Sequence, residues 1–200
     1  MKPQRTARVE RRTKETRIVC QVDLDGTGTR AVSTGIGFLD HMLEAFAAHS
    51  RIDLELECTG DLHIDDHHTA EDCALTLGAA LDEALGERTE ITRFGEATVP
   101  LDEALVRCVI DLSGRPFTDV DLAFRREALG GIATENVTHF FRSLGVALRM
   151  TLHVDQLKGE NDHHKAEAAF KACARALRTA VALDPSRDGV AAVPSTKGVL

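Results

Sequence analysis

Histidine and glutamate side chains occur in this 200-residue sequence in two matched sets whose spacing is typical of metal ligands. His67 and Glu71 are four residues apart, and so are His163 and Glu167. Residues four apart lie on the same face of an α-helix, so each pair can reach one ion. Imidazole and carboxylate donors without thiolate suit Mn, Fe, Co or Zn, and the sequence does not choose among them.

An internal repeat separates these residues from the other histidines. Cys20–Gly26 matches Cys108–Gly114 at an offset of 88 residues, His41 matches His139 at 98, and His67–Glu71 matches His163–Glu167 at 96. Because the matches come in the same order, we interpret the chain as two homologous halves, residues 1–92 and 93–187, followed by a tail, residues 188–200. His49, His63 and His153 have no counterpart and are expected to be structural or solvent-facing.

Adjacent histidines in each half require two ions rather than one. Neighbouring residues on a helix point about 100° apart, so His67 and His68 are poorly placed to bind the same ion. Near-twofold symmetry then predicts two ligand sets, each with three imidazoles and one carboxylate. The first set is His67, Glu71, His139 and His164, and the second is His163, Glu167, His41 and His68. Candidate acceptors for the other ring nitrogens are Asp65, Asp66, Asp72 and Asp162.

The elements that must position these residues follow the same order in both halves. Alternating or continuous apolar residues predict strands over Arg17–Leu24, Ile52–Cys58, Leu105–Leu112, Phe117–Phe124 and Met150–Val154. Helical spacing predicts helices around His41 and His139, and over His67–Leu85 and His163–Leu183, with caps at Asp65–Asp66 and Asn161–Asp162. The expected fold is α+β, with two homologous halves, each a small mixed β-sheet with two helices, packed with pseudo-twofold symmetry.

Composition excludes several classes of function. The net charge of −8 argues against nucleic-acid binding, and the basic stretch Arg5–Arg17 is expected to be a solvated arm. No apolar run approaches the roughly 18–20 residues that cross a bilayer, and the start of the chain lacks the apolar stretch of a secretory signal. The five cysteines lack CxxC spacing, which favours buried, reduced thiols in a cytoplasmic protein.

Several segments together resemble one enzyme family. They are Gly37–Leu43, Gly60–Asp72, Arg93–Gly95, Pro100–Ala104, Asp111–Pro116, Gly159–Glu167 and Pro194–Leu200. These segments are similar to the signature segments of imidazoleglycerol-phosphate dehydratases. The resemblance implies dehydration of D-erythro-imidazole glycerol phosphate to imidazole acetol phosphate in histidine biosynthesis. It also implies two Mn²⁺ ions per active site that bind the substrate imidazole as imidazolate, and a homo-oligomer of twenty-four subunits with interfacial active sites.

The resemblance also implies roles for single residues. Glu15 matches the family's acid/base and substrate-contact position, and it joins the ligands His67, His68, Glu71, His163, His164 and Glu167 in the catalytic set. The contacts to the substrate phosphate are expected to be Arg93, Arg115, Lys171, Ser195 and Lys197. Guanidinium groups fit phosphate oxygens in bidentate fashion, and Ser and Lys add donors. Asp102 is a candidate for orienting one of these groups.

Two other functions remain as alternatives at this point. A dinuclear metal-dependent hydrolase would use similar ligands, but such sites usually include a bridging carboxylate, which this pattern lacks. A metal-assembled structural or storage oligomer would explain the histidines and would leave Arg93, Arg115 and Lys197 without a role.

Overall fold

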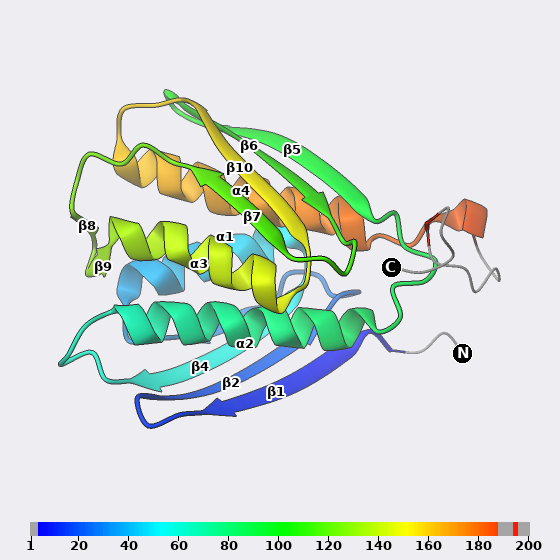
Figure 1. Ribbon diagram of the computed structural model, residues 1–200, viewed down its shortest axis with the longest axis horizontal. Helices are drawn as coiled ribbons and strands as arrows, with labels where there is room; N and C mark the ends of the chain where they lie inside the picture. Colours follow the sequence, from blue (N-terminus) through cyan, green and yellow to red (C-terminus); the bar gives the residue numbers. More distant parts are fainter. Residues whose placement is uncertain (1–3, 188–193, 196–200) are drawn as a thin grey trace.

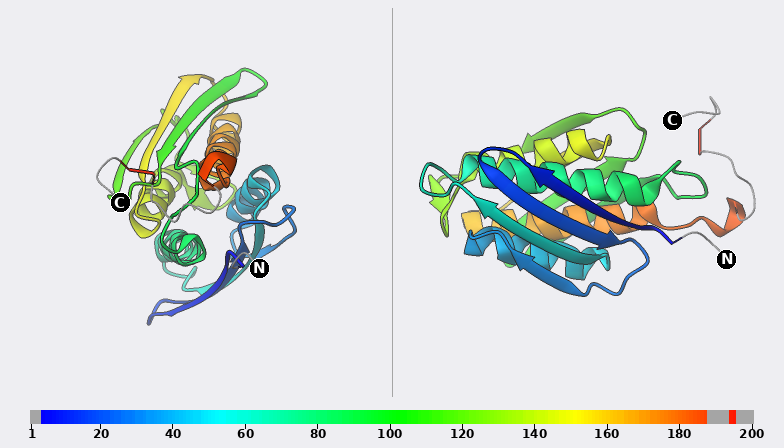
Figure 2. Two further views of the ribbon diagram at one scale, coloured as in Figure 1. Left: turned by 90° about the vertical axis from the view of Figure 1, so that its right-hand side faces the viewer. Right: turned by 90° about the horizontal axis from the view of Figure 1, so that it is seen from below.

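The computed structural model describes residues 4–187 and 194–195, which form two four-stranded sheets with four α-helices packed between them (Figures 1 and 2). The first sheet has the order β1 (Thr6–Arg12), β2 (Thr16–Asp23), β4 (Asp53–Gly60) and β3 (Arg30–Ser33). The second has the order β5 (Phe94–Leu101), β6 (Ala104–Asp111), β10 (Thr151–Lys158) and β7 (Phe117–Asp121). In each sheet the last strand pairs parallel and the other pairs are antiparallel. The predicted α+β fold with two similar mixed sheets is therefore confirmed.

Four helices fill the space between the sheets and join the two halves. They are α1 (Gly37–Ser50), α2 (His67–Leu85), α3 (Thr134–Ala147) and α4 (Asp162–Val181), and a short 3-10 helix, Pro185–Arg187, follows. α1 packs on α4 and α2 packs on α3, so each contact joins one half to the other. Phe140, Phe141 and Phe170 meet in the core between them, with ring centroids 4.7–6.0 Å apart. Because one continuous core spans both halves, neither half can separate without exposing it.

Edge strands account for most of the differences from the predicted elements. The basic stretch expected to be a solvated arm is mainly β1 and the start of β2, and Ala7 of β1 is buried. β1, β3 and β5 were not predicted, because an edge strand with one face in solvent carries few apolar residues. β7 ends at Asp121 rather than Phe124, where its pairing with β10 also ends. The chain then leaves the sheet for a small hairpin of β8 (Ala128–Leu129) and β9 (Ile132–Ala133).

The helix boundaries agree closely with the sequence pattern. α2 has the predicted bounds, and α4 ends at Val181, two residues before the predicted end. Asp65 Oδ1 accepts a hydrogen bond from the His67 amide at 2.9 Å. Asn161 Oδ1 accepts one from the His163 amide at 3.0 Å. These bonds satisfy amides that a helix leaves unpaired at its start, so each fixes the backbone of a candidate ligand.

All five cysteines are buried free thiols, as expected. Within the described residues, we find no helix of the length and apolar character needed to cross a membrane.

The carboxylate of Asp53 gives a testable contribution to stability. Its Oδ1 accepts hydrogen bonds from the amides of Thr27, Gly28 and Thr29 at 2.8–2.9 Å. Burial would raise the pKa of Asp53, but these amides outweigh it and lower the pKa below its ordinary value. We expect Asp53→Ala to lower the free energy of unfolding by about 1–3 kcal/mol at pH 7, because three amides lose their acceptor.

The pH dependence of this contribution has a defined sign. Because the folded-state pKa is depressed, the stabilisation is fully present above the unfolded-state pKa of Asp53 and is lost as the pH falls through the lower folded-state value. Urea denaturation of the two proteins at several pH values measures the difference, with Glu55→Ala on the exposed face of β4 as the control. A difference that stayed constant down to acid pH would contradict this account.

Candidate metal centre

Three side chains from α1 and α4 form the first candidate ion site. Ligand atoms of His41, His163 and Glu167 all lie within 4.8 Å of one another. Glu167 Oε2 is 3.1 Å from His163 Nε2 and 3.5 Å from His41 Nε2. His163 and Glu167 are one helical turn apart on α4, while His41 reaches them because α1 packs on α4. We call this group triad 1.

A second group repeats this arrangement on the other pair of helices. Ligand atoms of His67, Glu71 and His139 also lie within 4.8 Å of one another. His139 Nε2 is 2.9 Å from Glu71 Oε1, and the rings of His67 and His139 stack with centroids 4.9 Å apart. α2 supplies His67 and Glu71, and α3 supplies His139. We call this group triad 2, and the repeat predicted the members of both triads.

His68 and His164 lie outside the triads of their own chain, although each was predicted as a fourth ligand. His68 Nδ1 lies 3.0 Å from Asp61 Oδ2, and His164 Nδ1 lies 2.7 Å from Glu103 Oε2. A carboxylate on Nδ1 favours the tautomer with its proton there, which leaves the lone pair of Nε2 for an ion. Both rings therefore have the orientation that a metal ligand needs, but neither belongs to a triad of its own chain.

The carboxylates beside these two rings shift the pKa values of the histidines, and His164 in turn shifts that of Glu103. The hydrogen bond that His68 donates to Asp61 raises the pKa of His68, and the charges of Asp61 and Glu15 add to it. The hydrogen bond that His164 donates to Glu103 likewise raises the pKa of His164. In return, that bond to His164, followed by bonds from the amides of Asn161 and Glu160, lowers the pKa of Glu103 to about 2.

The residues that orient the rings differ from those predicted. Asp61, Glu103 and Asn136 take this role, and Asn136 Oδ1 lies 2.9 Å from His67 Nδ1. The four predicted aspartates bind other groups, because they precede or follow the ligands on the same helix and point elsewhere. Asp65 binds the His67 amide, Asp66 binds Ala133 and Asn136, Asp72 binds Arg11 and Thr16, and Asp162 binds Lys165 and two amides.

Lys171 lies one helical turn beyond triad 1. Its Nζ is 2.7 Å from Glu167 Oε1. Burial would raise the pKa of Glu167, but the hydrogen bond and charge of Lys171, with His163, lower it below its ordinary value. His49 of α1 belongs to the same cationic region: burial and then the charges of Lys171 and Arg175 lower its pKa. The sequence repeat did not assign a role to His49. Most of the charged residues near His49 lie on α4, far away in the sequence.

Arg93 and Arg115, predicted as phosphate contacts, lie at the far end of α4. The Arg93 amide binds Ala180 O, its guanidinium binds both oxygens of Asp111, and its Nη1 donates to Pro194 O at 2.6 Å. This last bond brings the segment with Ser195 beside Arg93. Arg115 is exposed in the connection that follows β6. Lys197 lies outside the described residues.

Asp102 does not lie with these phosphate candidates. It occupies the turn between β5 and β6, where its Oδ2 is 3.8 Å from His164 Nε2. This turn is at the other end of the second sheet from Arg93 of the same chain, so the suggestion that Asp102 orients a phosphate contact stays a prediction.

Glu15 lies in the turn between β1 and β2, where its side chain is exposed. Thr13 Oγ1 accepts hydrogen bonds from the amides of Glu15 and Thr16, at 3.1 and 2.9 Å. The buried carboxylate of Asp72 on α2 binds Thr16 Oγ1 at 2.5 Å and Arg11 Nε at 2.8 Å. The turn is therefore fixed to the helix that carries triad 2, and the charge of Glu15 is felt at His68.

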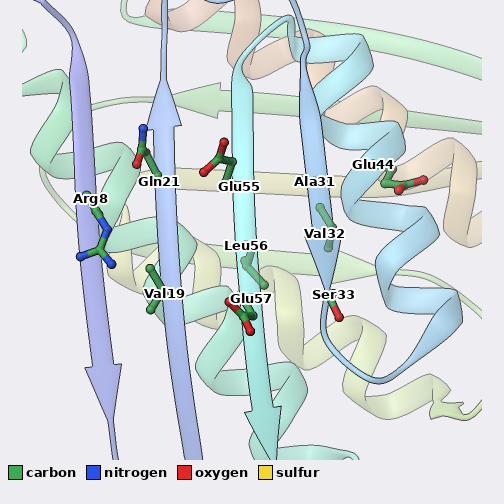
Figure 3. Close-up of a pocket in the computed structure, with 10 residues that line it drawn as sticks. All are labelled: Arg8, Val19, Gln21, Ala31, Val32, Ser33, Glu44, Glu55, Leu56 and Glu57. Carbon is green, nitrogen blue, oxygen red and sulfur yellow. The ribbon is translucent and has the colours of Figure 1, made fainter.

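The chemistry of the donors fits a divalent transition metal. Each triad offers two imidazoles and one carboxylate, and His68 and His164 are the candidates for a third imidazole. Such sets suit Mn, Fe, Co or Zn and leave coordination positions for a substrate. A hollow of about 600 Å³ on the outer face of the first sheet lies elsewhere, and none of the predicted site residues lines it (Figure 3).

Comparison with known proteins identifies the family. The family model described as imidazoleglycerol-phosphate dehydratase matches residues 34–177, which include both triads. The chain belongs to the imidazoleglycerol-phosphate dehydratase family. A dehydratase of this name from Phytophthora nicotianae is 59% identical over 196 residues, which are 98% of this chain and 42% of that longer protein. One from Salinibacter ruber is 53% identical over 196 residues, which are 98% of this chain and 96% of that protein.

Solved structures of the family share the fold. The imidazoleglycerol-phosphate dehydratase of Staphylococcus aureus N315 has a TM-score of 0.81 and 35% identity, covering 90% of this chain and 99% of its own. That of Pyrococcus furiosus has a TM-score of 0.82 and 41% identity, covering 96% and 100%. The predicted family and reaction class, a hydro-lyase of histidine biosynthesis, are confirmed, and the hydrolase alternative finds no support.

Proposed function

We propose that this chain binds two Mn²⁺ ions per active site and dehydrates D-erythro-imidazole glycerol phosphate to imidazole acetol phosphate between subunits of a cytoplasmic homo-oligomer. The observation that carries this proposal is the pair of triads, with the same donors on symmetry-related helices. Two triads per chain supply two ions per chain, and a substrate imidazole has two ring nitrogens to bind.

Distance within the chain supports an active site made by more than one subunit. α4 begins beside triad 1 and ends beside Arg93, whose amide binds Ala180 O. Seventeen residues from His163 to Ala180, at a rise of 1.5 Å per residue, span about 26 Å. A small phosphate ester cannot reach from triad 1 to Arg93 over that length. An Arg93 that binds the substrate phosphate must therefore do so at a site whose triad 1 belongs to another chain.

The outward-facing fourth histidines support the same conclusion. His68 and His164 are held by Asp61 and Glu103 with Nε2 available, yet neither belongs to a triad of its own chain. A neighbouring subunit that adds one of these rings to each triad would complete three imidazoles and one carboxylate per ion. We propose the octahedral assembly of twenty-four subunits that the family resemblance implies.

The proton that is removed sits on a carbon with no adjacent carbonyl, so an ordinary enolate cannot form. The substrate's imidazole ring must instead supply the electron pair that expels hydroxide from the carbon attached to the ring. When bound, the two ions supply Lewis acidity that stabilises this ring as imidazolate. We assign the role of proton acceptor to Glu15, which is exposed on its fixed turn. Loss of this proton from the carbon next to the ring-bearing one returns the electron pair to the ring and gives an enol. The expelled hydroxide takes up a proton as water, and the enol tautomerises to the ketone.

The substrate phosphate is proposed to bind mainly to cationic side chains. Lys171 holds Glu167 with its ammonium group at 2.7 Å and extends the positive region beside triad 1. Arg93, Arg115 and Ser195 lie at the far end of α4 from triad 1 and are proposed to act at a neighbouring subunit's site. Lys197, which lies outside the described residues, is proposed to act with them. Their charge-assisted hydrogen bonds hold the substrate so that the reacting carbon stays beside Glu15.

Mixing of two inactive variants tests whether sites are shared between chains. Glu167→Ala lacks a triad ligand and Arg115→Ala lacks an exposed phosphate contact, so each protein alone is expected to be nearly inactive. After dissociation and joint reassembly, some sites combine intact triads from one chain with an intact Arg115 from another. We expect partial recovery of turnover, measured by formation of the ketone product.

A mixture of Arg115→Ala with Ser195→Ala is the matched control, because both changes affect the phosphate contacts and most mixed sites still lack one. Recovery in neither mixture, with oligomers of wild-type size, would contradict the shared site.

A further inference from the structure

The connection between β7 and α3 is much longer than its counterpart in the first half. It spans residues 122–133, whereas the connection from β3 to α1 spans residues 34–36. We call residues 122–133 the strap; it contains the hairpin of β8 and β9. In Figure 1 this hairpin lies at the end of the helix layer where both α2 and α4 begin, which is where both triads lie.

One end of the strap is fixed to the first turn of α4. Asp162 Oδ2 accepts hydrogen bonds from the amides of Arg125 and Arg126, at 2.8 and 2.7 Å. Asp162 Oδ1 is 2.8 Å from Lys165 Nζ, which also donates to Ala123 O at 2.7 Å. The side chains of this ion pair are only 1% and 2% exposed. A buried pair of charges with all these partners makes a rigid attachment immediately before His163.

The first half has no such attachment. Thr69 stands at the position that corresponds to Lys165, and its buried Oγ1 has no hydrogen-bond partner. The ion pair and the strap therefore occur together in the second half.

The other end of the strap is fixed beside triad 2. Asp66 Oδ2 accepts hydrogen bonds from the Ala133 amide at 2.8 Å and from Asn136 Nδ2 at 3.0 Å. Asn136 Oδ1 in turn lies 2.9 Å from Nδ1 of the ligand His67. One continuous hydrogen-bond network thus connects the strap, the start of α2 and the ring of His67.

The turn of the hairpin contacts triad 1 through a phenylalanine. Leu129 and Ile132 are each 1% exposed and hold the hairpin to the core. Between them, a Cβ placed on Gly130 would lie 2.9 Å from Phe38 Cβ. The Phe38 ring packs edge-on against the His163 ring, with centroids 5.2 Å apart and an angle of 78° between planes. A shift of Phe38 would therefore move the ring of His163.

We propose that the strap is a positioning element for both ion sites, which sets the ring of His163 through Phe38 and the ring of His67 through Asp66 and Asn136. The inference rests on the proposed binding of ions at the triads. Its physical basis is that residues behind metal ligands fix ring orientation, and their loss typically weakens metal affinity by about 10–100-fold.

Two neighbouring glycines provide a matched test. Gly130 and Gly131 both have positive φ, at +51° and +87°, so alanine at either position strains the backbone. Only the methyl group at position 130 would press on Phe38, because a Cβ at Gly131 meets no atom within 4 Å. Mn²⁺ titration of the metal-free full-length proteins, followed by the electron paramagnetic resonance signal of the free ion, measures the affinity directly.

We expect Gly130→Ala to bind one of its two ions about 10–100-fold more weakly, while Gly131→Ala binds as the wild type does. In a Phe38→Ala background, adding Gly130→Ala should cause no further loss, because the contact that transmits the effect is gone. Asp66→Ala should weaken the other ion by a similar factor.

Failure of the strap inference and failure of the proposed function would give different results. Equal Mn²⁺ affinity of the Gly130→Ala and Gly131→Ala proteins would overturn the strap inference even if turnover were normal. Two ions bound by the wild type without dehydration would overturn the proposed function and leave the strap test interpretable. Additive losses in the double variant would show that Gly130 does not act through Phe38.

Discussion

His163→Ala is expected to lower the metal content by about one ion per chain and to abolish turnover. The imidazole of His163 lies 3.1 Å from Glu167 and is within reach of His41, so its removal leaves triad 1 with one imidazole and one carboxylate. Triad 2 is built from other helices and should keep its ion. A substrate ring held at only one nitrogen is no longer stabilised as imidazolate, so kcat should fall by at least about a thousandfold.

Elemental analysis of the purified variant and a turnover assay measure both effects. His153→Ala is the control, since His153 lies on β10 away from the triads and has only Asp119 within 4.0 Å as a charged partner. His163→Ala with full metal content and wild-type turnover would show that triad 1 is not an ion site.

Glu15→Gln is expected to lower kcat by about 100- to 10,000-fold with little change in KM, the usual range for loss of a general base. The amide cannot accept the proton, but it has nearly the same size and keeps the turn intact, because Thr13, Thr16 and Asp72 hold it. The metal content should stay at the wild-type value, which separates this effect from loss of a ligand.

Glu10→Gln is the matched control on the same hairpin, where Glu10 is exposed on β1 and lies 3.4 Å from Arg17. Steady-state kinetics of the two variants under identical conditions give the comparison. If both retained wild-type kcat, another group would have to accept the proton.

The sequence revealed the ligands of the triads because a duplicated scaffold shows each one twice. His41 and His139, and the pairs on α2 and α4, recur in the same order, and helix spacing then joins each histidine to its glutamate. The groups that orient the rings were missed, because Asp61, Glu103 and Asn136 come from different elements and share no repeat position. Contacts of this kind depend on packing, and a local pattern does not contain them.

A change in the repeat offset did signal the strap. The offset is 88 residues at the strands and 98 at His41 and His139, which requires extra residues in the second half between those points. The longer connection from β7 to α3 accounts for nearly all of the difference. Its role could not be predicted, because Asp162 and Asp66 act on backbone amides, and such bonds do not depend on the side chains of the strap.

The distance between triad 1 and Arg93, which supports the proposal of a shared site, likewise could not be derived from residue spacing. Arg93 follows α2 closely in sequence, yet the fold places it about 26 Å along α4 from His163, as the rise per residue gives. The direction of α4 in the folded chain separates triad 1 from Arg93, and the proposal of a shared site rests on that separation.

The most direct test of this account is turnover of imidazole glycerol phosphate by metal-stripped protein, measured during stepwise addition of Mn²⁺. We predict no turnover without metal, and recovery that reaches its plateau near two ions per chain. Full turnover in the metal-free protein, or two tightly bound ions with no dehydration, would contradict the assignment of the triads as the catalytic centre.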